Sequence, residues 1–224
     1  MKSQKIDIKK IVGIAMFAAL AFVVSLVFRF PVTFLTFDAK DAIITLAGFI
    51  FGPISALVTS LLAAILEFQI SDTKVYGFIM NFASSATFSV TSSLIYKYKR
   101  TFFGSLIAFY SATVVLTAVM LCMNILVTPF YMGVPRSVVI ENIPTLFLPF
   151  NLAKALLNSA IAMLLYKPVI TSLRKAKLIK ASNSIEVSGN SRFLNRFTIY
   201  TIAFALSTLA IAVLIFIVTK TKAA

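Results

Sequence analysis

Long apolar segments alternate with short polar ones along almost the whole chain. Several of these segments approach the roughly 20 apolar residues that a helix needs to cross the hydrocarbon core of a bilayer. The pattern therefore predicts an all-α, polytopic membrane protein with helices at 11–29, 42–52, 54–70, 77–96, 103–127, 144–166 and 197–218. Residues 1–180 are expected to form a six-helix membrane domain, 181–196 a polar cytoplasmic linker, and 197–218 an additional transmembrane helix.

The second apolar segment is shorter than a full span, and Gly52-Pro53 separates it from the third. Proline lacks a backbone N–H and its ring clashes with the preceding helical turn, so a helix does not run straight through it. The two segments could therefore form a bent hairpin or a partly inserted pair. Such departures from simple crossing often mark a substrate site in transporters.

Composition excludes a soluble protein. The chain is 60% hydrophobic and 12% charged, whereas soluble domains have about 25% charged residues. No small-residue cleavage site follows the first apolar segment, so we expect an uncleaved first helix.

The formal net charge of +14 is explained by where the basic residues lie. They gather at the ends of predicted spans, and the positive-inside rule makes these ends cytoplasmic, with the N-terminus inside. A nucleic-acid partner is not needed to explain them. The clusters are Lys2, Lys5, Lys9 and Lys10; Lys97, Lys99 and Arg100; and seven residues from Lys167 to Arg196.

Polar side chains inside the spans are the candidates for function, since each must find a partner or line a cavity. Asn151, Lys154 and Asn158 are spaced i, i+3 and i+7, which places them on one helix face. They could line a binding site. Alternatively, Lys154 could pair with an internal carboxylate such as Glu67 while the asparagines bond to neighbouring helices.

Two other spans carry similar stripes. Thr117, Asn124 and Thr128 lead into Pro129, Tyr131 and Gly133, where the fifth helix is expected to stop. The fourth span carries a further stripe of Asn81, Ser85, Phe88 and Ser92.

The loop 31–41 mixes aromatic residues with Asp38, Lys40 and Asp41. It could fold as a lid over an external cavity, or these charges could form only a solvated corner. The Asp38-x-x-Asp41 spacing is weak as a metal pair, because no histidine or further carboxylate completes it.

The absence of several catalytic and nucleotide-binding motifs narrows the range of possible functions. The chain has no histidine, no phosphate-binding glycine loop and no nucleophile elbow, and its single cysteine, Cys122, lies within a span. We therefore expect no catalytic residue, metal or cofactor. Uphill transport would have to draw on an ion gradient or on partner subunits.

Three stretches resemble the S components of energy-coupling factor (ECF) vitamin transporters, most closely the riboflavin-specific branch. They are FDAKDAIITLAGFIFGP (37–53), NILVTPFYMG (124–133) and LPFNLAKALLN (148–158), together with the basic N-terminus and the alanine-rich first helix. The resemblance covers about residues 5–178. The seventh helix is not part of the family pattern.

The resemblance implies a six-helix subunit that captures a vitamin outside the cell and works with a transmembrane coupling subunit and two cytoplasmic ATPases. It places Asn151, Lys154 and Asn124 at the ligand. It also places Ala15 and Ala19, a small-x-x-x-small pair, against the coupling subunit. The full candidate substrate-binding set is Asn151, Lys154, Asn124, Asn158, Asn81, Glu67, Asp38, Lys40 and Tyr131.

Other functions stay open at this point. The same machinery could carry pantothenate, whose carboxylate would pair with Lys154. A membrane-embedded lipid-modifying enzyme could use Asp38, Asp41 and Glu67, although no metal or base is evident. A self-sufficient secondary transporter could use Glu67 as a proton carrier.

Overall fold

The computed structural model describes residues 8–32, 35–71, 73–100 and 102–175, with isolated residues between 199 and 213. Its elements in chain order are α1 (Ile8–Val27), β1 (Phe30–Val32), β2 (Leu35–Phe37), α2 (Lys40–Phe51), α3 (Pro53–Phe68), α4 (Lys74–Tyr98), α5 (Phe102–Met132), α6 (Arg136–Glu141), a π-helical turn η1 (Ile143–Phe147) and α7 (Leu148–Lys175).

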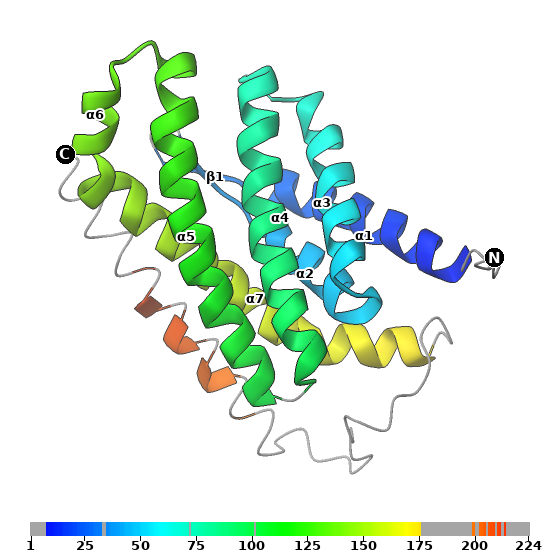
Figure 1. Ribbon diagram of the computed structural model, residues 1–224. Helices are drawn as coiled ribbons and strands as arrows, with labels where there is room; N and C mark the ends of the chain where they lie inside the picture. Colours follow the sequence, from blue (N-terminus) through cyan, green and yellow to red (C-terminus); the bar gives the residue numbers. More distant parts are fainter. Residues whose placement is uncertain are drawn as a thin grey trace, which may run out of the picture.

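The prediction of an all-α membrane protein is confirmed. In Figure 1, α3, α4 and α5 stand side by side, and α7 crosses beside them. Within the described residues, four helices are long and apolar enough to cross a membrane: Ile8–Val27, Lys74–Tyr98, Phe103–Met132 and the continuous stretch Ile143–Tyr166. The chain is a multi-pass membrane protein.

The α2–α3 step has the bent geometry that Gly52-Pro53 predicts. Gly52 lies in the left-handed region with φ 97°, and Pro53 occupies the first turn of α3, where a missing N–H costs little. With 12 residues, α2 is only about 18 Å long and too short to span the hydrocarbon core. It lies almost wholly buried inside the bundle.

α2 packs closely against α4 at Gly48. A Cβ added to Gly48 would lie 2.0 Å from Ser93 Oγ and 2.8 Å from the Cβ of Ala56. The absence of a side chain at this position therefore sets how near the two helices come.

We expect Gly48→Ala to destabilise the protein by about 1–3 kcal/mol, because the added methyl overpacks this contact. Thermal unfolding of the purified variant in detergent measures the loss. Adding Ser93→Ala to the same chain removes the nearest atom and is expected to recover part of the stability, since the Cβ of Ala56 stays at 2.8 Å. A Gly48→Ala variant as stable as the parent would contradict this packing.

Two helices extend beyond the predicted spans. The span predicted to end at 127 continues as α5 through Pro129 to Met132, and it ends at Gly133, which adopts φ 64° and is the last of the residues expected to stop the helix. A proline removes one backbone hydrogen bond, which a long membrane helix tolerates. Similarly, α7 continues past 166 to Lys175 with Pro168 inside it.

The loop after α1 contains a small antiparallel hairpin, formed by β1 and β2. Phe30 pairs with Phe37 and Pro31 with Thr36. At the end of β2, the Phe37 ring packs against the Phe150 ring of α7 with centroids 4.5 Å apart. This contact fixes the hairpin against the bundle.

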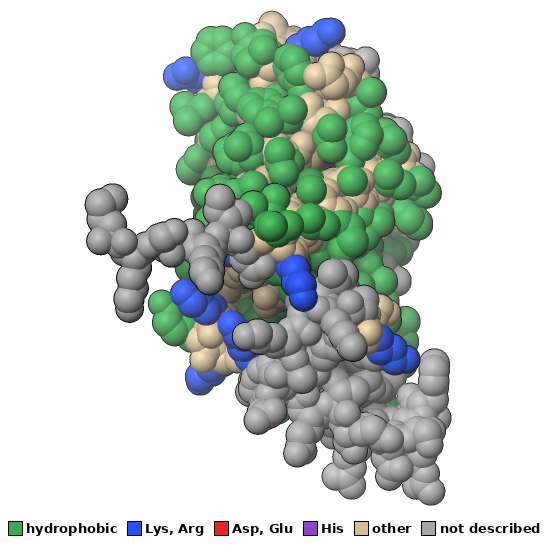
Figure 2. Space-filling view, turned by 90° about the vertical axis from the view of Figure 1, so that its right-hand side faces the viewer, with side chains coloured by type: hydrophobic (Ala, Val, Ile, Leu, Met, Phe, Trp, Pro, Cys, Tyr) green, Lys and Arg blue, Asp and Glu red, His purple; other side chains and the backbone are tan. Residues whose placement is uncertain are grey.

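The described outer surface is mainly apolar, as a lipid-facing protein requires. In Figure 2, hydrophobic side chains cover the upper part of the visible face, and most of its lysine and arginine side chains gather in the lower part. Exposed basic residues include Lys9, Lys97, Lys99, Arg100 and Lys175.

The predicted linker, 181–196, lies outside the described residues. The described residues between 199 and 213 are helical, and Figure 1 shows them alongside α5. The Phe204 ring contacts Tyr110 of α5 edge-on, with centroids 5.9 Å apart. This part of the predicted seventh helix thus packs on the outside of the bundle.

Candidate functional site

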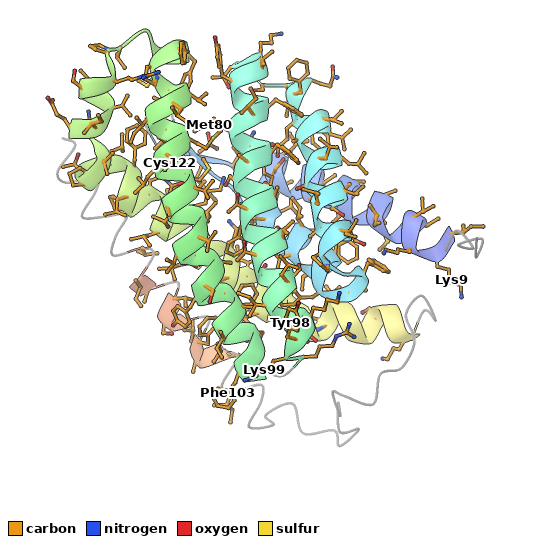
Figure 3. The ribbon with its side chains drawn as sticks, in the orientation of Figure 1. Lys9, Met80, Tyr98, Lys99, Phe103 and Cys122 are labelled. Carbon is orange, nitrogen blue, oxygen red and sulfur yellow. The ribbon has the colours of Figure 1, made fainter. Side chains whose placement is uncertain are left out.

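A cavity of about 550 Å³ lies among α1, the β1–β2 hairpin, the start of α2, α3, α4, α5 and α7. Its volume falls within the range of small-molecule pockets. Figure 3 places the lining residue Met80 in the upper half of the bundle, whereas Tyr98, Lys99 and Phe103 mark the opposite end. The cavity therefore lies toward the end of the bundle opposite Tyr98 and Lys99.

The cavity brings together all the predicted substrate-binding residues except Asn158. The ones that line it are Asn151, Lys154, Asn124, Asn81, Glu67, Asp38, Lys40 and Tyr131. They come from five separate parts of the chain, so the fold gathers polar groups that the sequence keeps far apart.

Lys154 is paired with a carboxylate, but not with the one considered from the sequence. Its Nζ donates to Asp38 Oδ2 at 2.9 Å, and both side chains are buried. Glu67 instead pairs with Lys40, which lies on the first turn of α2. Both lysines in the cavity wall are thus neutralised by carboxylates.

Asn81 joins the second ion pair. Its Nδ2 donates to Glu67 Oε2 at 2.9 Å, the same oxygen that Lys40 contacts. One carboxylate oxygen therefore links α2, α3 and α4 at the cavity wall. Two charge-assisted hydrogen bonds to one oxygen hold the Glu67 side chain in place.

Asn158 supports the site from behind. Its Nδ2 donates to the backbone oxygens of Asp38 at 2.9 Å and Lys154 at 3.1 Å, and its Oδ1 accepts from Ala42 N at 2.9 Å. It does not line the cavity. Its amide fixes the backbone that carries Asp38. The geometry therefore gives Asn158 a supporting role and no direct contact with a ligand in the cavity.

The four residues Asp38-Ala39-Lys40-Asp41, which we name the anchor segment, tie the hairpin to three helices. Asp38 binds Lys154 of α7, Lys40 binds Glu67 of α3, and the Asp41 carboxylate accepts from Ser85 of α4. The solvated-corner interpretation of this segment is wrong, since these three charged residues are at most 6% exposed. Because the two aspartates bind different helices, they do not form a metal pair.

The hairpin forms a wall of the cavity, as a lid would. Leu35 and Thr36 line it, and the adjacent Phe37 packs on α7. The anchor segment follows the hairpin directly in sequence. The residues that form the ion pairs are therefore joined to the hairpin wall through the backbone.

Asn151 and Asn124 are held by their own helices. Asn151 Nδ2 donates to Phe147 O at 2.7 Å, and Asn124 Nδ2 donates to Met120 O at 2.8 Å. Asn124 Oδ1 also accepts from Thr128 Oγ1 at 3.1 Å. These bonds fix the rotamers and leave each amide a second N–H. Asn151 also has its carbonyl oxygen available to a ligand.

Sequence reasoning missed part of the lining. Phe150 and Met80 each precede a predicted polar residue, and that adjacency was the available signal. Others come from helix ends and loops, where no periodicity identifies the inward face. The missed lining residues are Ser25, Arg29, Leu35, Thr36, Ile70, Ser71, Thr73, Tyr76, Gly77, Met80, Ser84, Met120 and Phe150.

Ala15 and Ala19 lie on the exposed side of α1. The buried face of the same helix is formed by other residues: Gly13, Phe17, Ala18, Ala21 and Ser25. The two alanines therefore do not pack within the described bundle, and they are open to another protein or to lipid.

Residues 9–170 match the family described as ECF transporter, substrate-specific component. The chain is 31% identical over 177 residues to the riboflavin transporter RibU of Staphylococcus aureus (strain TCH60), covering 75% of this chain and 93% of that protein. It is 24% identical over 187 residues to the riboflavin transporter FmnP of Bacillus subtilis (strain 168), covering 76% and 98%.

The fold is also similar to that of a solved structure. This is the S component of a bacterial ECF transporter, with a TM-score of 0.64 and 30% sequence identity. The match covers 98% of that chain and 74% of this one. The family match ends at residue 170, before the seventh helix.

Proposed function

The chain belongs to the family of substrate-specific components of ECF transporters, and we propose that the substrate it binds is riboflavin. Members of this family are transport subunits rather than enzymes, and they work with an ATP-driven ECF module. That assignment decides against the membrane-embedded enzyme considered from the sequence.

The state of the two lysines carries the choice of riboflavin. Lys154 and Lys40 already pair with Asp38 and Glu67, so neither buried lysine is left to attract an anion, and the remaining lining cation, Arg29, is exposed. Pantothenate would bring a carboxylate into a wall that already holds two. A flavin brings a neutral ring and hydroxyl groups, which the amides can bind.

The apolar part of the lining suits the flavin ring. Tyr76, Tyr131 and Phe150 offer aromatic surface, and Met80 and Met120 add polarisable contacts. Ligand pockets typically combine such surface with a few placed polar groups. Asn124, Asn151 and Lys154 would supply those groups.

The experiment that tests this proposal identifies the small molecule that accompanies the chain. Protein purified from cells supplied with riboflavin is denatured, and the released compounds are identified by mass spectrometry. We expect riboflavin in near-equal molar amount to the protein. Release of pantothenate or another vitamin in that amount, with no flavin, would overturn the choice of substrate.

The orientation follows from the basic clusters. We propose that the N-terminus and the ends carrying Lys97, Lys99 and Arg100 are cytoplasmic. The cavity then opens to the outside, where the vitamin is captured. Ala15 and Ala19 are proposed to meet the transmembrane coupling subunit, because small residues let helices approach closely.

A secondary transporter that uses Glu67 as a proton carrier is less well supported. Glu67 is held by Lys40 and Asn81, so its carboxylate serves to join α2, α3 and α4 at the cavity wall. Uptake that persisted without the ATPases and collapsed with the proton gradient would favour that alternative.

The six-helix domain is proposed to bind its ligand without the seventh helix. Phe204 packs on the outer side of α5, and no described residue beyond 175 lines the cavity. Deleting residues 182–224 is therefore expected to leave riboflavin affinity unchanged, as measured by fluorescence titration. Lost binding by a shortened chain that still folds would show that the seventh helix contributes to the site.

A further inference from the structure

Two carboxylate oxygens in the cavity wall lack a hydrogen-bond partner. In the described part of the chain, three buried side-chain oxygens are in this state: Asp38 Oδ1, Glu67 Oε1 and Ser93 Oγ. Asp38 and Glu67 line the cavity, whereas Ser93 does not. A buried acceptor without a donor costs free energy, so each invites an explanation.

The two carboxylates share one arrangement. In each, one oxygen is held by a lysine: Lys154 binds Asp38 Oδ2, and Lys40 binds Glu67 Oε2. The side chains are thereby fixed, and the second oxygen of each is left over. Both residues are more than nine-tenths buried, so bulk water does not readily serve these oxygens.

An ionised carboxylate oxygen only accepts hydrogen bonds. It therefore favours ligand groups that donate, and it repels groups that only accept or carry negative charge. The paired lysines disfavour a metal cation at the same place. Hydroxyl groups of a neutral ligand fit this requirement.

We propose that Asp38 Oδ1 and Glu67 Oε1 bind the hydroxylated tail of the ligand. We name these two hydrogen-bond acceptors the donor-reading pair, because they select ligand groups that donate. This inference rests on the proposed function, since the tail is the ribityl chain of riboflavin. The pair determines specificity: it distinguishes a flavin with a hydroxylated tail from the bare ring system. The asparagines and the aromatic residues remain available for the ring.

The test compares two ligands on one protein. Riboflavin and lumiflavin share the ring, but lumiflavin has a methyl group in place of the ribityl chain. Both titrations follow flavin fluorescence with purified chain in detergent. We expect the unmodified chain to prefer riboflavin strongly, and Glu67→Gln to lower riboflavin affinity roughly 10- to 100-fold while leaving lumiflavin affinity nearly unchanged.

A second variant protects the test against misfolding. Lys40→Met with Glu67→Leu removes the whole ion pair without leaving a buried charge, which proteins often tolerate. It is expected to lose the same preference. Ser93→Ala is the matched control. It removes the third unpartnered oxygen, which lies outside the cavity, and is expected to change neither the riboflavin nor the lumiflavin affinity.

The outcomes separate the two proposals. Equal losses for riboflavin and lumiflavin in folded variants, or a parent chain that binds both equally, would overturn the donor-reading pair and leave the riboflavin assignment standing. A folded parent chain that binds neither flavin would overturn the proposed function and this inference with it.

Discussion

Replacing Lys154 with methionine is expected to lower riboflavin affinity roughly 100-fold and to destabilise the protein by about 3–5 kcal/mol. Lys154 lines the cavity and is the ion-pair partner of Asp38, and both side chains are buried. Removing the lysine leaves a buried carboxylate without its counter-charge. The hairpin wall that precedes Asp38 would also lose one of its attachments to α7 and would keep the Phe37–Phe150 contact.

A double variant separates the two effects of this substitution. Lys154→Met with Asp38→Asn removes both charges, so most of the stability is expected to return while riboflavin affinity stays low. Thermal unfolding and flavin titration on the parent, both single variants and the double variant complete the cycle. If Lys154→Met left affinity and stability unchanged, the ion pair would have neither role.

Replacing Ala19 with leucine is expected to reduce ATP-dependent riboflavin uptake at least about tenfold while leaving riboflavin binding intact. Ala19 is exposed on α1, away from the cavity. A larger side chain would hold the coupling subunit away from the helix, and a loss of 1.4 kcal/mol in association is tenfold. Uptake is measured in cells carrying the ECF module, and binding with purified chain.

Leu20→Phe is the matched control for Ala19→Leu. Leu20 is also exposed on α1, but it lies about 100° around the helix from Ala19. It is expected to keep normal uptake. Normal uptake by Ala19→Leu as well would mean that the coupling subunit meets another surface.

The buried polar face of α7 was predictable because periodicity needs only local sequence. Asn151, Lys154 and Asn158 are spaced for one face of a helix, and all three are buried on α7. Their separate roles were not predictable. Asn158 turns to the backbone of Asp38, 120 positions away, and only the tertiary fold creates that contact.

The ion-pair partners show the same limit. Both Asp38 and Glu67 were candidates, and a pattern along the chain cannot decide which lysine each one meets. The short α2 decides it by placing Lys40 beside α3 while Asp38 reaches α7. Helix ends were predicted less well, since Pro129 and Pro168 lie inside helices that tolerate them.

The anchor segment explains why one stretch serves both the fold and the site. Asp38, Lys40 and Asp41 each bind a different helix, so α3, α4 and α7 meet at the first turn of α2. Two of those contacts also line the cavity. The structural role and the proposed binding role are consequently coupled there, and the double variants above are needed to separate them.

The most direct test of the account is a fluorescence titration of the purified, ligand-free chain with riboflavin in the presence of excess pantothenate. An enclosed flavin ring among aromatic side chains is expected to be quenched, with saturation at one riboflavin per chain and no displacement by pantothenate. Folded protein that leaves riboflavin emission unchanged, or that releases the flavin to pantothenate, would contradict the assignment.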